Sequence, residues 1–72
     1  MFKDKLGREI YQGDVLAFVS WGDRYPQMKF VRVKDGCSFA LQLEPYEEKG
    51  DLQVVSSAAH MVIVKRDAQE GL

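Results

Sequence analysis

An alternation of apolar side chains with small or polar ones from Cys37 to Glu44 is the feature that most constrains the fold of this chain. One parity of the segment holds only apolar residues: Cys37, Phe39, Leu41 and Leu43. A period of two places alternate side chains on opposite faces of a β-strand. The pattern therefore predicts a half-buried strand, with Cys37 as a small buried hydrophobic residue on its core face.

A tight turn is predicted directly before this strand. Asp35 and Gly36 form a dipeptide that is favoured in two-residue type I′ turns, where both central residues need positive φ. The β-rich segment Met28–Lys34 precedes the turn and is the expected hairpin partner. The nearly continuous apolar run Val15–Ser20 predicts a further strand, buried on both faces.

Two long loops and two short strands complete the predicted order. The first loop covers residues 21–27 and contains Pro26, which has no N–H for a strand ladder. The second loop covers residues 45–51. Three short elements are predicted after this loop: a strand over 52–55, one helical turn over 56–60 with Ser56 or Ser57 as its N-cap, and a closing strand over 61–64.

This order predicts a mostly β fold, a small five-stranded SH3-like barrel with one short helical turn before the last strand. Closing a curled sheet removes exposed strand edges, which favours a barrel for five short strands. An OB-fold fits less well, because it generally needs a longer chain and a helix between strands three and four. We expect one domain over residues 1–66 and a flexible C-terminal tail over 67–72. A single core in 72 residues is marginal, so homodimerisation would be an accessible way to gain stability.

The segment Asp4–Leu16 resembles the opening of the YopX-type proteins of phages and prophages. Those proteins typically read Asp-x-Asn-Gly-x-Glu-Ile-Tyr-x-Gly-Asp followed by apolar residues, and here Leu6 stands in place of the Asn. The resemblance implies a phage or prophage origin and a small β-barrel. We expect Gly7, Gly13 and Asp14 to be structural, since Gly13 can take positive φ and Asp14 can bond a nearby backbone amide.

The composition predicts an ordinary globular domain of a reducing cytoplasm, which the resemblance to phage proteins implies is the host bacterial cytoplasm. The chain is 46% hydrophobic and 29% charged, with a net charge of −1, which argues against disorder and against general polyanion binding. Its apolar runs fall short of the roughly 18 residues of a membrane span. The start Met1–Lys5 lacks the apolar core of a signal peptide. The single cysteine, Cys37, cannot form an internal disulfide, which fits a reducing compartment.

The residues offer no catalytic or metal-binding pattern, so we expect no enzyme, no metal and no cofactor. One cysteine and one histidine cannot supply a four-ligand zinc site. A nucleophilic pair of Cys37 and His60 would need a third group to orient the imidazole, and the sequence suggests none. His60 is expected to be packed or on the surface. The carboxylates of Glu44, Glu47 and Glu48 are expected to be solvated loop charges.

Aromatic side chains in or beside the two long loops form the main candidate binding site. Trp21, Arg24 and Tyr25 lie in the first loop, and Tyr46 lies in the second. The corresponding loops of SH3-like barrels gather near one end and line the usual ligand groove. Exposed aromatic residues together with Arg are also typical of binding hot spots. Trp21 could instead fill the barrel core, and the sequence leaves this alternative open.

Three functions fit these features. The one we expect is a small phage or prophage accessory protein, a non-catalytic protein-binding module that modulates a host factor. The first alternative is a nucleic-acid-binding barrel with aromatic stacking platforms, although the sequence pI of about 5.7 opposes general binding. Its contact residues would be the basic stretch Arg24, Lys29, Arg32 and Lys34. The second alternative is a structural or assembly protein that acts as an oligomer.

Overall fold

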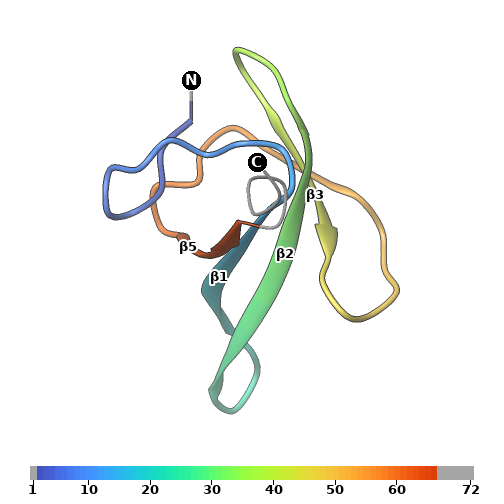
Figure 1. The fold of residues 1–72 in the computed structure, drawn as a ribbon. Coiled ribbons are helices and arrows are strands. Elements are labelled where there is room, and N and C mark those ends of the chain that lie inside the picture. Colours follow the sequence, from blue (N-terminus) through green and yellow to red (C-terminus); the bar gives the residue numbers. More distant parts are fainter. Residues whose placement is uncertain (1, 67–72) are drawn as a thin grey trace.

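The computed structural model describes residues 2–66, which form one antiparallel sheet of five strands (Figure 1). The strands are β1 Asp14–Trp21, β2 Pro26–Gly36, β3 Leu41–Pro45, β4 Gln53–Val55 and β5 Val62–Arg66. Their order in the sheet is β4-β3-β2-β1-β5, so the first four strands form a meander and β5 returns beside β1. The prediction of a mostly β fold is confirmed. The predicted tail over 67–72 lies outside the described residues.

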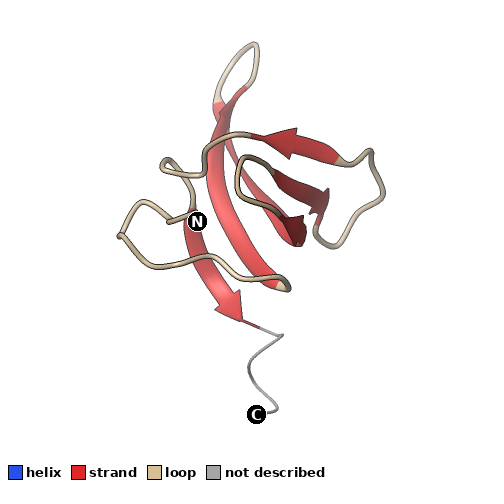
Figure 2. Cartoon of the chain, turned by 90° about the horizontal axis from the view of Figure 1, so that it is seen from above, coloured by secondary structure: helices blue, strands red, loops and turns tan. Residues whose placement is uncertain are grey.

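The sheet curves strongly but does not close within residues 2–66. β4 and β5 are its two edges, and Figure 2 shows the curvature from above. Residues 2–66 therefore form an open, curved sheet and not the closed barrel expected from the sequence. The described part of the chain contains no helix, and hence none that could cross a membrane.

The helical turn expected before the last strand is not seen. Ser57 Oγ accepts the N–H of Ala59 at 3.3 Å, as an N-cap would. The N–H of Met61 then donates to the carbonyl of Ala58 at 3.0 Å, which closes a tight turn that leads directly into β5. A helix does not follow, because a segment of five residues gains too few hydrogen bonds to repay nucleation.

The core lies on the concave side of the sheet, where side chains of one parity from the three central strands meet. Leu16 of β1 opposes Val31 of β2, and Val33 of β2 opposes Leu43 of β3. These side chains are buried, and further apolar residues pack against them from the sheet and the connecting segments: Ile10, Leu41, Ala58, Met61 and Ile63.

The predicted type I′ turn at Asp35 and Gly36 is wrong. Both residues belong to β2, where Gly36 opposes Leu41, and the described glycines with positive φ do not include Gly36. The turn lies over residues 37–40 instead, with the N–H of Cys37 donating to the carbonyl of Ala40 at 2.9 Å.

A bulge in β2 explains the displaced turn. The register between β2 and β3 shifts between Val33 and Asp35, so one extra residue is accommodated on β2 and the strand continues past the predicted turn. The alternation that begins at Cys37 consequently faces the core only from Leu41 onward. Cys37 is exposed and Phe39 is 76% exposed, so the prediction of a buried Cys37 is wrong.

Buried Asp4 ties the N-terminal segment to the sheet. Its carboxylate accepts the backbone N–H groups of Leu6, Arg8 and Ile63 at 3.0, 2.9 and 3.1 Å. The Arg8 guanidinium donates to the same carboxylate through Nε at 3.1 Å and Nη2 at 2.9 Å. Burial acts to raise the pKa of Asp4, but the bonds from Ile63 and Arg8 outweigh it and lower the pKa from 3.8 to about 2.

The structural roles expected of Gly13 and Asp14 are confirmed. Gly13 has a φ of 93°, in the left-handed region that favours glycine. Asp14 is buried at the start of β1, and its Oδ2 accepts the N–H of Tyr11 at 2.9 Å. Arg66 of β5 lies 3.8 Å from that oxygen and donates to the carbonyl of Glu9 at 2.7 Å. The turn that begins β1 is thus fixed against the last strand.

Candidate functional site

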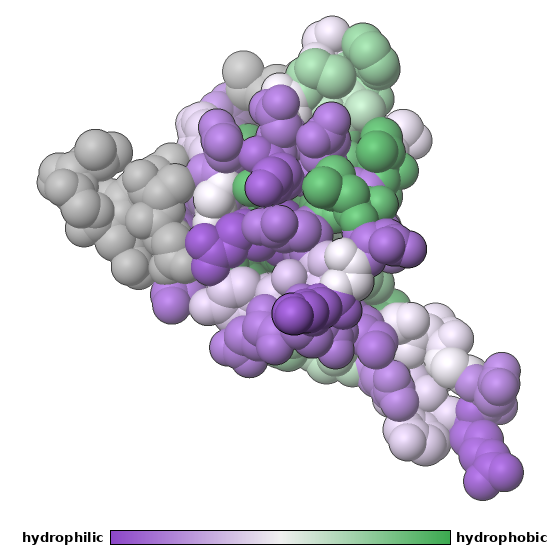
Figure 3. All heavy atoms as spheres, turned by 90° about the vertical axis from the view of Figure 1, so that its right-hand side faces the viewer, coloured by the Kyte–Doolittle hydropathy of each residue, from purple (hydrophilic) through white to green (hydrophobic). Residues whose placement is uncertain are grey.

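The β1–β2 hairpin extends beyond both of its neighbouring strands and projects from the body of the molecule (Figure 1). Within residues 2–66, β5 pairs with β1 over Asp14–Ala17, and β3 pairs with β2 over Val31–Gly36. Residues 18–30 therefore form a two-stranded ribbon, which we call the arm. In Figure 3 the arm projects beyond a body whose visible face is largely hydrophilic.

The ribbon continues almost to its tip, which corrects the predicted loop over residues 21–27. Trp21 ends β1 opposite Pro26, and the N–H of Gly22 donates to the carbonyl of Tyr25 at 3.3 Å. Hydrogen-bonded and non-hydrogen-bonded pairs alternate in antiparallel ladders. The Trp21–Pro26 pair is therefore a non-hydrogen-bonded one, a position that tolerates the missing N–H of proline.

The register places the apolar side chains of the arm on the side of the hairpin that faces away from the core. Val19 opposes Met28 and Ala17 opposes Phe30, with the parity opposite to that of the core residue Leu16. We call this side the outer side of the arm, and it consists of Val19, Trp21, Met28 and Phe30. The large side chains among them are all at least partly exposed, up to 58% for Met28 and 78% for Trp21.

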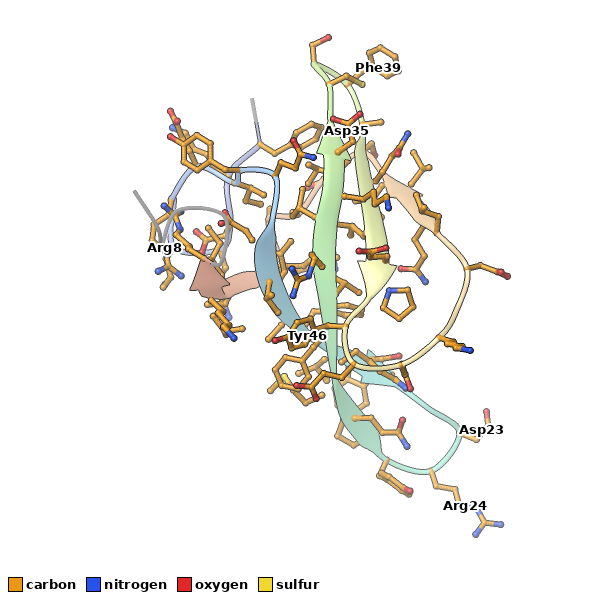
Figure 4. All side chains as sticks on the ribbon, turned by 45° about the vertical axis from the view of Figure 1, so that its right-hand side comes forward. Arg8, Asp23, Arg24, Asp35, Phe39 and Tyr46 are labelled. Atoms are coloured by element: carbon orange, nitrogen blue, oxygen red, sulfur yellow. The ribbon has the colours of Figure 1, made fainter. Side chains whose placement is uncertain are left out.

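Three of the four predicted site residues meet at the tip of the arm. Trp21 lies at the end of β1, and Arg24 and Tyr25 lie in the connecting turn, where Arg24 points away from the body (Figure 4). Tyr25 is 62% exposed. The exposure of Trp21 settles the alternative that the sequence left open, since this side chain does not fill the core.

Tyr46, the fourth predicted residue, lies at the base of the arm (Figure 4). Its N–H donates to the carbonyl of Phe30 at 3.1 Å. Phe30 lies four positions, or about 13 Å of strand, along β2 from Pro26, the residue opposite Trp21. The predicted residues thus lie at the two ends of one surface rather than in a single cluster.

Val19 and Met28, which help to join these two ends, were not recognised in the sequence, and Phe30 was considered only as a stacking platform for nucleic-acid bases. Val19, Met28 and Phe30 supply the apolar surface between the tip and the base. The sequence signal for this surface was that Val19 and Trp21 occupy alternate positions and so lie on one face of a strand. Because a loop was predicted from residue 21 onward, the pairing of this strand with residues 26–30 was not expected.

A depression of about 320 Å³ opens on the outer side at the base of the arm. Its lining residues come from β1, β2, β5 and the loop after β3: Val15, Phe30, Tyr46, Glu47, Val64 and Lys65. The Arg32 guanidinium lies 5.0 Å from the centroid of the Tyr46 ring and holds that ring in place. Glu47 has a φ of 68°, a left-handed conformation that is costly for a residue with a side chain and is often associated with functional sites.

The four cations of the nucleic-acid alternative do not form one basic surface. Arg24 lies at the tip, and Lys29 lies on the core side of the ribbon opposite Phe18. Arg32 opposes Glu44, and Lys34 Nζ lies 3.9 Å from the Glu44 carboxylate. A carboxylate between the cations repels a phosphate backbone, so this geometry favours an apolar contact over a polyanion.

The residues considered for catalysis lie apart. The His60 ring packs edge-on against Phe18, with 5.9 Å between the ring centroids. Phe18, and with it His60, lies beside Lys29 of β2, whereas Cys37 directly follows Gly36 of the same strand. Lys29 and Gly36 are seven positions, or about 23 Å, apart along β2. Residues 2–66 contain no group of three or more His, Cys, Asp or Glu side chains that could hold a metal ion.

Comparisons with protein-family models, with curated proteins and with solved structures found no match to this chain. The functional argument therefore depends on the geometry of the molecule itself. The feature with the most distinctive geometry is the arm, with aromatic side chains at its tip and a depression at its base.

Proposed function

We propose that this chain is a non-catalytic protein-binding module and that the outer side of the arm is its contact surface. The observation that carries this proposal is the exposed apolar run on a projecting ribbon, with Trp21 at one end and Phe30 at the other. Contiguous exposed apolar patches are uncommon on monomeric proteins and mark sites of interaction. Trp, Tyr, Met and Arg, all present on the arm, are the residue types enriched in interfaces.

The proposed biological setting is that of a small phage or prophage accessory protein in the cytoplasm of the host bacterium. The resemblance of Asp4–Leu16 to the YopX-type proteins supports this setting. The bound protein would then be a phage protein or a host factor that the module modulates. We propose that the fold is an SH3-like barrel left open between β4 and β5, a proposal supported by the four-stranded meander with β5 returning beside β1.

The energetics of such a contact would centre on the tip. Trp21 on the outer side of the arm and Tyr25 in the adjoining turn offer large rigid areas and lose little conformational entropy on docking. Removing one central aromatic side chain typically costs about 2 kcal/mol or more of binding free energy. Because both side chains are exposed, their removal should leave folding nearly unchanged.

Position-specific photo-cross-linking tests the proposal. A photoactivatable phenylalanine analogue at position 21 should form protein adducts in the native cell. The matched control is the same analogue at Phe39, an equally exposed aromatic residue on the other hairpin. Adducts at position 21 and none at position 39 are expected. Equal labelling at both positions, or none at position 21, would contradict a contact surface on the arm.

A further inference from the structure

We infer that the arm binds a second copy of this chain, with the two arms packed antiparallel through their outer sides. The inference rests on the proposed function, since it names the partner of the same surface. It starts from a match within one molecule: the tip of the arm presents a projecting side chain, and its base presents a depression that can receive one.

Trp21 supplies the projecting group and the depression beside Tyr46 supplies the receiving site. Trp21 is 78% exposed at the tip, while the depression of about 320 Å³ is large enough for an aromatic side chain. Its walls are largely apolar, from Val15, Phe30 and Val64. Burying an indole there would remove both surfaces from water, and an aromatic anchor in a pocket is typical of interface centres.

The spacing along the ribbon makes the match reciprocal. Trp21 and the depression lie about 13 Å apart along the ribbon, on the same side of it. In an antiparallel pair of arms, each tip lies over the base of the other copy, and Val19 and Met28 lie midway, near the two-fold axis. Such an interface is isologous, so the contact between Trp21 of one copy and the depression of the other forms twice and the assembly closes at two copies.

Charges at the two ends also complement each other. The tip carries a cation and an anion, Arg24 and Asp23, and the depression is lined by an anion and a cation, Glu47 and Lys65. The loop that follows Glu47 is acidic, with Glu48 and Asp51 against one Lys49. An antiparallel pair brings the Arg24 guanidinium of each copy to Glu47 of the other and Asp23 to Lys65, which fixes orientation and partner choice.

Charge reversal provides the test. Arg24→Glu and Glu47→Arg should each weaken self-association of the full chain at least about tenfold, because each places like charges together at both ends of the interface. An equimolar mixture of the two variants should associate as well as the unmodified chain, since every tip–base contact in the mixed pair again joins opposite charges. Sedimentation from about 1 µM to about 1 mM measures the association.

Two further measurements keep the test decisive. Met28→Lys should abolish association, since it places two ammonium groups near the axis, whereas Lys5→Glu, on the N-terminal segment, should leave association unchanged. The emission of Trp21 should shift to shorter wavelength as the chain associates, because the indole leaves water.

Failure of this inference can be told from failure of the proposed function. A chain that stays monomeric at about 1 mM, with unshifted Trp21 emission, overturns the second copy as partner. The proposed function would survive that result if the analogue at position 21 still formed adducts with other proteins while the analogue at position 39 formed none. If the analogue at position 21 forms adducts of twice the mass of the chain, the proposed function and the second copy as partner are both supported. If it forms no adduct, both are overturned.

Discussion

Asp4 and Ile63 lie 59 residues apart, yet the carboxylate of Asp4 accepts the Ile63 N–H at 3.1 Å and so joins the first turn of the chain to its last strand. The same carboxylate holds the Arg8 guanidinium, which donates in turn to the carbonyl of Ile63 at 2.7 Å. The first acidic residue of the segment 4–16 therefore has a structural explanation in this chain.

Replacing Asp4 should test that role. Asp4→Ala would leave the buried Ile63 N–H without its acceptor and Arg8 without its counter-ion, and we expect a loss of about 3 kcal/mol in unfolding free energy. Asp51→Ala, in an exposed loop, should change it by less than about 0.5 kcal/mol. Urea unfolding at neutral pH measures both variants. Equal effects would mean that Asp4 does not hold the segment in place.

The pH dependence of stability follows from the lowered pKa of Asp4. Because that pKa is about 2 in the folded chain and 3.8 without these contacts, the folded state binds fewer protons between the two values. The contribution of Asp4 is therefore complete above pH 3.8 and is lost as the pH falls toward 2. The stability difference between the unmodified chain and Asp4→Asn should shrink over that range in urea titrations. A constant difference would contradict the assignment.

At the scale of elements, the arm and the sheet body should respond differently to truncation. Trp21→Ala removes an exposed side chain and should change the unfolding free energy by less than about 0.5 kcal/mol. Leu16→Ala removes a fully buried side chain from the same strand and should cost about 3 kcal/mol. Denaturant unfolding of the two variants at low protein concentration provides the comparison. A large loss for Trp21→Ala would place the indole in the fold rather than on a contact surface.

Strand identity was predictable from the sequence, but strand ends were not. The apolar patterns in β1, β2, β3 and β5 predict their existence, because period-two alternation or a short apolar run is typical of strands. The end of β2 was not predictable from Asp35-Gly36, because the bulge near Val33 depends on pairing with β3. The pairing of β2 with β3, and not the local turn preference of Asp35-Gly36, determines where the strand ends.

The candidate site was predictable only in part for the same reason. Trp21, Arg24, Tyr25 and Tyr46 stood out by residue type, but their separation along the ribbon depends on the β1–β2 register. Asp4 was missed altogether, because a carboxylate near an N-terminus has no sequence signal that distinguishes a buried role from a solvated one.

At the scale of the whole molecule, the arm makes a small domain elongated, with extents of 41 × 23 × 22 Å. A chain of 72 residues can bury a single small core, and its largest aromatic side chain lies outside that core. The placement of Trp21 in solvent gives the fold little stability and leaves a large rigid side chain exposed at the tip of the arm.

The emission of Trp21 in dilute protein tests the central claim most directly, since it is the only tryptophan in the chain. Well below micromolar concentration, where copies are separate, we predict an emission maximum close to that of free tryptophan in water, with full access to a soluble quencher. Emission that stays at short wavelength and resists quenching at every dilution would place Trp21 inside the fold, and the arm would then have no exposed anchor for a partner.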